Sequence, residues 1–403
     1  MSNPLQRARV QPQAEQASVS QLELFFDLVF VFALTQVTDL LAHEPNLTNL
    51  ARSVLVLAVL WWAWVGYSWL GNVARADEGI VRVAIFGAMG AAFIIALTIP
   101  EAFDDLPGGL SGPVVFALAY FTVRTIHLVM MWVASDDNPE FRGQVLRWIP
   151  SVTLGTALLL AASQTTGTAQ TLLWLGALAG DYVGTLIAGE GWVLRSVSHF
   201  AERHGLIIIV ALGESIVSIG VGVAALPISW PIIIASMLGL AVSALLWWTY
   251  FDVASLAVEH ELDRADGARQ IKIARNSYSF GHLPMVIGVI MLSLGLKKVL
   301  SYVGGDEQHT LSDGLHGIPL VALYGGVVLF LLALVHMKGY ATRSISWSRV
   351  VAAVAIVALV PVAAMLPALL QLGILCALLA ILVAYETITY AAPRDEIRHG
   401  HAE

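Results

Sequence analysis

Twelve apolar stretches, each of about twenty residues, fill most of this chain and are joined by short polar segments. The hydrocarbon core of a bilayer is about 30 Å thick, which an α-helix of roughly 20 residues crosses. A backbone that faces lipid must satisfy its own hydrogen bonds, and a helix does so within one segment. Because 58% of the residues are apolar and only 12% are charged, the sequence predicts an all-α, polytopic membrane helix bundle with twelve transmembrane helices.

The predicted spans follow the apolar stretches. They are residues 21–42, 49–71, 80–103, 112–134, 145–162, 170–188, 203–224, 230–251, 275–298, 315–337, 348–365 and 366–390. Residues 350–390 are too long for one span, and Pro361 and Pro367 lie near their middle, so a helical hairpin is predicted there. A polar tail is predicted on each side of the spans, at 1–20 and at 392–403.

The spans leave little of the 403-residue chain for a soluble domain, so one membrane domain is predicted. No long basic run points to nucleic acid as a partner. Cys376 is the single cysteine, which excludes an intramolecular disulfide. The first apolar stretch carries Glu23, Asp27 and Gln36, unlike the short apolar core of a cleavable signal peptide. The lipid bilayer is the expected partner, and no cofactor or metal site is predicted.

The distribution of lysine and arginine predicts the orientation, because basic residues are retained on the cytoplasmic side. The N-terminal tail and alternate loops hold seventeen of the 21 basic residues: Arg7, Arg9, Arg75, Arg82, Arg142, Arg147, Arg195, Arg203, Arg264, Arg269, Lys272, Arg275, Lys338, Arg343, Arg349, Arg394 and Arg398. The other side holds Arg52, Lys297 and Lys298, and Arg124 lies inside a span. This bias predicts that both termini are cytoplasmic.

The two halves of the chain resemble each other. Residues 26–36 align with 204–214, 60–62 with 246–248, 75–77 with 264–266, and 172–176 with 369–373. Four matches in order, at offsets of 178 to 197 residues, predict two six-helix repeats at 21–200 and 201–391. Since each half has an even number of spans, the repeats are expected to be parallel. The alignment places Asp27 opposite Gly205 and Gln36 opposite Glu214, so the halves contribute different polar groups.

Glu214 lies about midway along the seventh predicted span. An ionisable side chain near the bilayer centre costs about 2.5–3.5 kcal/mol on insertion scales, so it is expected to face the bundle interior. Helical spacing places Ser218 on the same face. Two interpretations stay open. Glu214 handles a proton, an ion or a substrate, or it is a structural carboxylate paired with a base.

Arg124 lies at a similar depth in the fourth span, and His127 follows it by about one helical turn. Pairing Arg124 with Glu214 would lower the cost of burying both charges. Such a pair could form a working site or only fix the packing of helices. Asp181 is a further interior candidate, as is His282, although a lone intramembrane histidine is more often a hydrogen-bonded packing residue than a metal ligand.

Glu23 and Asp27 are four residues apart and therefore share one face at the start of the first span. They fit either an entry for protons or cations or a pair of interfacial anchors. Because Glu23 lies at the very edge of the span, the anchor fits it better.

Enzyme motifs are absent from the sequence: it has no GxSxG, P-loop, HExxH or Cys/His metal cluster. Asp27, Glu202 and His204 are the nearest approach to a catalytic set, and they would suit a reaction on lipid. No nucleophile stands at a diagnostic spacing from them, so an enzyme is the second alternative.

Two motifs carry a family resemblance. Residues 23–33 read ELFFDLVFVFA, and residues 202–206 read ERHGL, followed by LGES at 212–215. They resemble the two signatures of the bacterial low-temperature-requirement A (LtrA) family, along the whole chain. The matching positions are Glu23, Phe26, Asp27, Glu202, Arg203, His204 and Glu214. The resemblance implies a bacterial inner (cytoplasmic) membrane protein needed for growth in the cold, and it leaves the reaction open.

These observations favour a transporter or channel for an ion or a small solute, coupled to protons through Glu214 and Asp27. A membrane-embedded enzyme acting on lipid and a scaffold or sensor without transport remain alternatives. The transported species and the oligomeric state, including a homo-oligomer, stay open.

Overall fold

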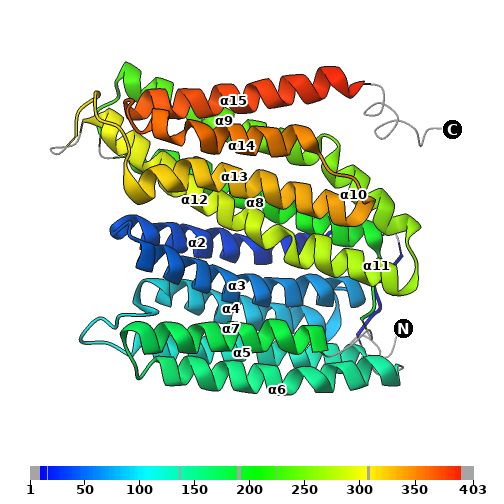
Figure 1. The fold of residues 1–403 in the computed structure, drawn as a ribbon. Coiled ribbons are helices and arrows are strands. Elements are labelled where there is room, and N and C mark those ends of the chain that lie inside the picture. Colours follow the sequence, from blue (N-terminus) through cyan, green and yellow to red (C-terminus); the bar gives the residue numbers. More distant parts are fainter. Residues whose placement is uncertain are drawn as a thin grey trace. The chain divides into compact units, whose positions relative to one another are not determined.

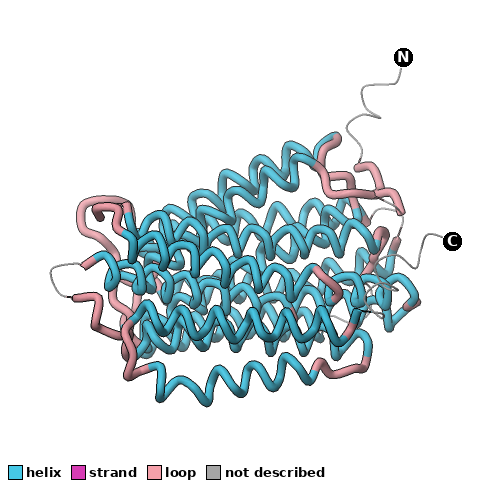
Figure 2. Tube along the Cα trace, turned by 90° about the horizontal axis from the view of Figure 1, so that it is seen from above, coloured by secondary structure: helices cyan, strands magenta, loops and turns pink. Residues whose placement is uncertain are grey.

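The computed structural model describes residues 10–15, 17–135, 138–187, 192–224, 226–305 and 309–391. Helices form almost all of these residues, and their only β-type pairing is an isolated bridge between Pro12 and Ala74. Figure 2 shows the loops gathered at the ends of the helices. The predicted all-α fold is confirmed. The predicted tail at 392–403, and Arg7, Arg9, Arg394 and Arg398, lie outside the described residues.

The chain divides into two compact units, of which the first is Met1–Glu44 with Thr48–Arg203. Its helices are α2 (Gln21–His43), α3 (Leu47–Val73), α4 (Gly79–Thr98), α5 (Gly112–Ala134), α6 (Pro139–Ala162), α7 (Gly167–Ile187) and the first residues of α8 (Val197–Val223). A short 3₁₀ turn, Ile99–Glu101, extends α4. Within this unit the helices lie as neighbouring rods (Figure 1).

The second unit is Pro45–Leu47 with His204–Glu403. It contains the rest of α8, α9 (Trp230–Phe251), α10 (Ala254–Arg264), α11 (Gly267–Ile273), α12 (His282–Gly304), α13 (Gly317–Thr342), α14 (Trp347–Ala363) and α15 (Ala368–Thr389). A π-helix, Ala274–Phe280, joins α11 to α12. The predicted hairpin is present, because α14 ends at Ala363 and Pro367 directly precedes α15.

Among the described residues, ten helical segments are long and apolar enough to cross a membrane. They are Gln21–His43, Leu47–Val73, Gly79–Glu101, Gly112–Ala134, Pro139–Ala162, Val197–Val223, Trp230–Arg264, Gly267–Gly304, Gly317–Thr342 and Ala368–Thr389. This pattern is that of a multi-pass membrane protein. The predicted spans that correspond to α7 and to the 17-residue α14 lie outside this set, so the number twelve stays a prediction.

Two helices begin six residues before their predicted spans. The α6 helix begins at Pro139 rather than at 145, because the side chain of Asn138 accepts a hydrogen bond from the backbone N–H of Phe141 at 3.0 Å and caps it. The α8 helix begins at Val197 rather than at 203. Arg203, which is the first residue of the predicted span although it was counted with the loops in the distribution of basic residues, lies well within α8, and it is 1% exposed.

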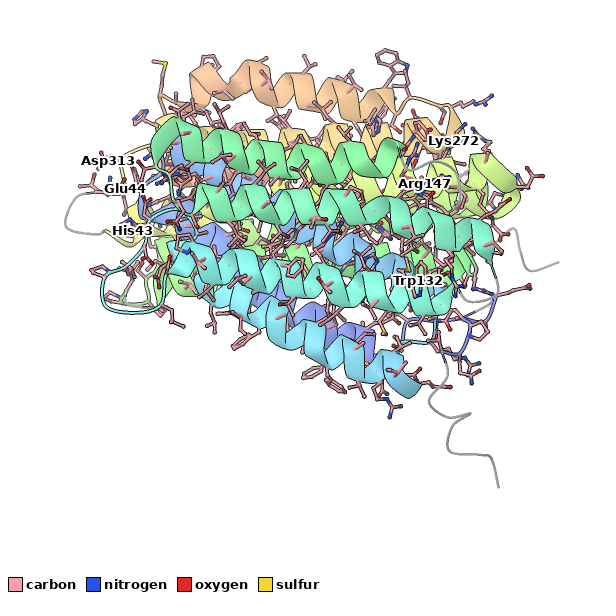
Figure 3. The ribbon with its side chains drawn as sticks, turned by 90° about the horizontal axis from the view of Figure 1, so that it is seen from below. His43, Glu44, Trp132, Arg147, Lys272 and Asp313 are labelled. Carbon is pink, nitrogen blue, oxygen red and sulfur yellow. The ribbon has the colours of Figure 1, made fainter. Side chains whose placement is uncertain are left out.

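Within each unit, labelled residues of alternate connections lie at opposite helix ends (Figure 3). In the first unit, His43 and Glu44 lie at one end, and Trp132 and Arg147 lie at the other. In the second unit, Lys272 and Asp313 are likewise at opposite ends. Successive spans that alternate in direction would give this arrangement.

Helices α12 and α13 lie side by side in the second unit (Figure 1) and touch through glycines. A Cβ atom built on Gly326 would come within 2.5 Å of the carbonyl oxygen of Gly288, and one built on Gly295 within 2.6 Å of the Cα of Leu323. Small residues that let two backbones meet are a common basis of helix packing in membranes, where no hydrophobic effect drives association.

Replacing Gly326 with alanine is expected to lower the free energy of unfolding by about 1–3 kcal/mol, because the new methyl group would meet backbone atoms. The matched control is Gly325→Ala, whose Cβ would have its nearest neighbour at 3.6 Å. Thermal unfolding in detergent measures both. Equal unfolding midpoints for the two variants would contradict this packing.

Candidate functional site

The first unit brings the two sequence motifs together. Glu23 and Asp27 are one turn apart on α2, and His199 and Arg203 are one turn apart on α8. The two pairs face each other, and all four residues are at most 3% exposed. We call these four residues, with Trp64 of α3, the signature cluster.

Arg203 and Asp27 form the centre of the signature cluster. The guanidinium Nη1 of Arg203 donates to Asp27 Oδ2 and also to the backbone carbonyl of Glu23, at 3.0 Å from the latter. The indole N–H of Trp64 donates to Asp27 Oδ1 at 2.9 Å, and the guanidinium of Arg203 lies 5.5 Å from the centre of the Trp64 ring. Asp27 therefore accepts from a cation and from a neutral donor, and the cation also contacts an aromatic face.

Glu23 links the start of α2 to His199. Its Oε2 accepts hydrogen bonds from the backbone N–H and the hydroxyl of Ser20, both at 2.9 Å, which completes a capping box. Its Oε1 lies 3.0 Å from His199 Nε2 and 3.8 Å from Arg203 Nε. Because Glu23 is buried and bound on two sides, the interfacial-anchor interpretation does not describe it.

The end of α3 holds this arrangement in place. The amide of Asn72 donates to the carbonyl of Ser196 at 2.6 Å, and its oxygen accepts from the backbone N–H of Arg195 at 2.8 Å. Its nitrogen lies 3.5 Å from His199 Nδ1. Because an amide nitrogen only donates, this contact assigns the hydrogen of a neutral His199 to Nε2, where it points to Glu23. A Cβ on Gly71 would lie 2.2 Å from Glu23 Oε1, so any larger residue there would displace the Glu23 carboxylate.

Glu202 is exposed, unlike its neighbours on α8, and accepts a hydrogen bond from the backbone N–H of Val19 at 2.8 Å. It ties the segment before α2 to α8. Of the predicted set of Asp27, Glu202 and His204, the first unit contains Asp27, which is bound to Arg203 and Trp64, and Glu202, which is exposed. His204 belongs to the second unit, so the set stays a prediction.

A second charged group lies in the same unit. Arg124 of α5 contacts Asp181 of α7 at 3.2 Å, and the hydroxyl of Tyr120 donates to the other Asp181 oxygen at 2.6 Å. The residues Arg124 and Asp181 are 5% and 3% exposed. The carboxylate that compensates Arg124 is thus Asp181, and the expected pairing with Glu214 is not needed to explain its burial.

Next to this pair, several buried polar atoms have no hydrogen-bond partner among the described residues. They are both amide atoms of Gln144 and the indole nitrogen of Trp148. His127 and Trp148 stack with ring centres 6.1 Å apart, and Gln144 is one turn before Trp148 on α6. Buried polar groups are nearly always bonded to protein or to ordered water, so these groups call for a functional explanation.

In the second unit Glu214 is 1% exposed on α8, and its Oε1 accepts from the hydroxyl of Ser218 at 3.0 Å. This confirms that Ser218 shares its face. The neighbouring Ser215 contacts Ser243 of α9 at 2.7 Å. Gln36, the predicted counterpart in the other half, is half-buried on α2.

His204 and His282 meet in the second unit, with ring centres 5.1 Å apart. His282 begins α12 directly after the π-helix, contacts the carbonyl of Ser277 through Nδ1 at 3.2 Å and lies 2.8 Å from the hydroxyl of Tyr250 through Nε2. The carbonyl fixes the hydrogen on Nδ1, so Nε2 accepts from Tyr250. This is a hydrogen-bonded packing histidine. Among the described residues, no three His, Cys, Asp or Glu side chains gather as metal ligands.

Sequence reasoning missed His199, Trp64 and Asn72. His199 stands four residues before Arg203, the same spacing that separates Glu23 from Asp27, and this spacing was a usable signal. Trp64 gives no such signal, because tryptophan is common at membrane interfaces whatever its role.

Comparison with known proteins agrees with the motifs. The sequence model of a family described as "Bacterial low temperature requirement A protein (LtrA)" matches residues 18–384. The chain is also similar to the "Uncharacterized protein RA0937" of Rhizobium meliloti (strain 1021), with 28% identity over 353 residues, which are 83% of this chain and 81% of that protein. No solved structure matches the chain.

Proposed function

The chain belongs to the bacterial low temperature requirement A family, and we propose that it is a proton- or ion-coupled membrane transporter or channel for a small solute, with the signature cluster as its coupling site. A role in growth in the cold is part of the same proposal. Among the described residues, ten apolar helices are long enough to cross a membrane, as a transporter or channel requires. The main support for the proposal is the charge of the signature cluster.

The formal charge of the signature cluster does not balance. Glu23 and Asp27 contribute −2 and Arg203 contributes +1, which leaves −1 when His199 is neutral. A buried net charge is costly, whereas one added proton or one monovalent cation makes the sum zero. His199, 3.0 Å from Glu23, is the base of the cluster that can take this proton, and binding and release of a single positive charge is the task of a coupling site.

The unpartnered polar atoms of Gln144 and Trp148 support a polar route inside the first unit. Glu214, buried with Ser218, is the proposed carboxylate of the second unit. Two parallel repeats at 21–200 and 201–391, the inner membrane and cytoplasmic termini complete the proposal, supported by the sequence matches and the basic-residue bias.

Asp27→Asn is expected to abolish proton flux, at least tenfold below the parent protein, while the protein still folds. Asparagine keeps an acceptor for Trp64, and the remaining Glu23 and Arg203 balance each other, so the imbalance that attracts a proton is gone. Proteoliposomes that contain a pH-sensitive dye, driven by a potassium diffusion potential, measure the flux. Glu214→Gln is expected to behave likewise, because glutamine still accepts from Ser218.

The matched control is Glu202→Gln, which removes an exposed carboxylate from the same motif and is expected to keep full flux. A well-folded Asp27→Asn protein with full flux would remove the signature cluster from the site. Parent proteoliposomes that match empty ones in proton flux, and in uptake of sodium and potassium, would favour the scaffold or the lipid-directed enzyme instead.

A further inference from the structure

A cavity of about 230 Å³ opens at one end of the helices of the second unit. The ends of α9 and α13 line it, together with the beginning of α14 and the end of α15. Its wall holds two cationic side chains, Lys338 and Arg349, and the seryl groups of the 344–348 segment.

Arg349 is 6% exposed and uses only part of its guanidinium. Its Nε and Nη2 donate to the two oxygens of Glu386, both at 3.0 Å, as a fork on a carboxylate. The third nitrogen, Nη1, has no hydrogen-bond partner among the described residues. A buried guanidinium nitrogen without an acceptor is costly. Arg349 lines the cavity, so an anionic oxygen that reached Nη1 from the cavity would satisfy it.

Lys338 provides a second donor in the same cavity. Its Nζ contacts only a neutral partner at 3.3 Å, the hydroxyl of Ser346. An ammonium group with three N–H donors retains donors for an anion. Two carboxylates, Asp252 and Glu386, also line the cavity, so the formal charges of its side chains sum to zero; the unused N–H donors of Lys338 and Arg349, and not a net charge, favour a phosphate oxygen.

The rim of the cavity is typical of a membrane interface. Trp248 is 40% exposed, Tyr390 46% and Ile345 56%. Tryptophan and tyrosine gather at the headgroup level of bilayers, and basic pockets at helix ends hold anionic headgroups. A ligand with a phosphate and apolar chains would match both the donors inside and the apolar rim.

We propose that this cavity binds the phosphate of a membrane lipid headgroup, with Arg349 Nη1 and Lys338 Nζ as its donors and the exposed aromatic side chains beside its acyl chains. This assignment is independent of transport, because no residue of the cavity belongs to the signature cluster.

The purified protein in a maltoside detergent is titrated with dihexanoyl phosphatidylglycerol, with dihexanoylglycerol, which lacks the phosphate, and with inorganic phosphate. Thermal unfolding reports binding. The phosphatidylglycerol is expected to raise the unfolding midpoint with saturation, and the other two compounds to leave it nearly unchanged. An equal effect of dihexanoylglycerol would show an apolar groove, and an equal effect of inorganic phosphate would show a site for free phosphate; each overturns the proposal.

Variants locate the site. Lys338→Gln is expected to lower the affinity for the lipid about tenfold, and it leaves the pair of Arg349 and Glu386 intact. Arg349→Gln alone would leave the Glu386 carboxylate without its cationic partner, so it is combined with Glu386→Gln. The double variant is expected to lose saturable binding of the lipid. Lys272→Gln removes an exposed charge on α11 away from the cavity and should change nothing. Unchanged lipid affinity in both the Lys338 variant and the double variant would refute the assignment.

Discussion

Arg203→Leu is expected to leave little folded protein. The change removes the cation of the signature cluster and leaves the carboxylates of Glu23 and Asp27 buried together, with His199 as the only remaining base among the residues of the cluster. Breaking a buried ion pair by removing one partner costs about 3–5 kcal/mol. That is a large part of the stability of a typical domain, which is about 5–15 kcal/mol. The yield of monodisperse protein in detergent, and its unfolding midpoint, measure the loss.

A second change is expected to restore most of the loss. In the double variant Arg203→Leu with Asp27→Asn, the remaining carboxylate, Glu23, still contacts His199 and Ser20, and the new asparagine side chain keeps an acceptor for the indole of Trp64. The control Arg195→Leu removes an exposed charge from the segment before α8 and should be neutral. If Arg203→Leu matched the parent in yield and midpoint, the cluster would not be a stabilising unit, and the proposed site would lose its basis.

Cysteine labelling is expected to give all-or-none answers about orientation. In a Cys376→Ser background, a cysteine at Thr166, between α6 and α7, should react with an impermeant maleimide only from outside, and one at Ala268, at the start of α11, only from the cytoplasm. Both positions are exposed, so the membrane alone blocks the reagent. Right-side-out and inside-out membrane vesicles supply the two faces.

Denatured protein labelled at both positions provides the control for reactivity. The proposed orientation would be reversed if the cysteine at 166 reacted only from the cytoplasm. Reaction of both cysteines from the same face would instead mean that the number of spans between α6 and α11 differs from the proposed one by an odd number, so the proposed topology would fail there.

The helical fold could be predicted because bilayer thickness and backbone hydrogen bonding both act on local sequence. Apolar stretches located ten membrane helices, and two prolines located the hairpin of α14 and α15. The predicted ends of the helices were less accurate, since capping residues such as Asn138 let a helix begin outside its apolar stretch. Arg203 shows the consequence: treated as the last basic residue of a loop, it is the buried centre of a cluster.

Of the candidate site, only the charged residues could be predicted from the sequence. Burial cost identifies Glu23, Asp27, Arg124 and Asp181, because any ionisable group within an apolar stretch needs an explanation. Depth along a helix does not say which partner a charge has. It therefore could not identify Asp181 for Arg124, or add the neutral donors Trp64 and Tyr120, which are known only once helices are packed.

The capping box at Ser20 has a consequence for the first membrane helix. In most membrane helices the boundary follows the point at which side chains become apolar, so the helix can slide by a residue or two with bilayer thickness. Here Glu23, which forms the capping box with Ser20 in the first turn, also contacts His199 on another helix. The position at which α2 begins is therefore set by a contact within the protein and not by the lipid. A thicker or thinner bilayer would have to deform around this helix end.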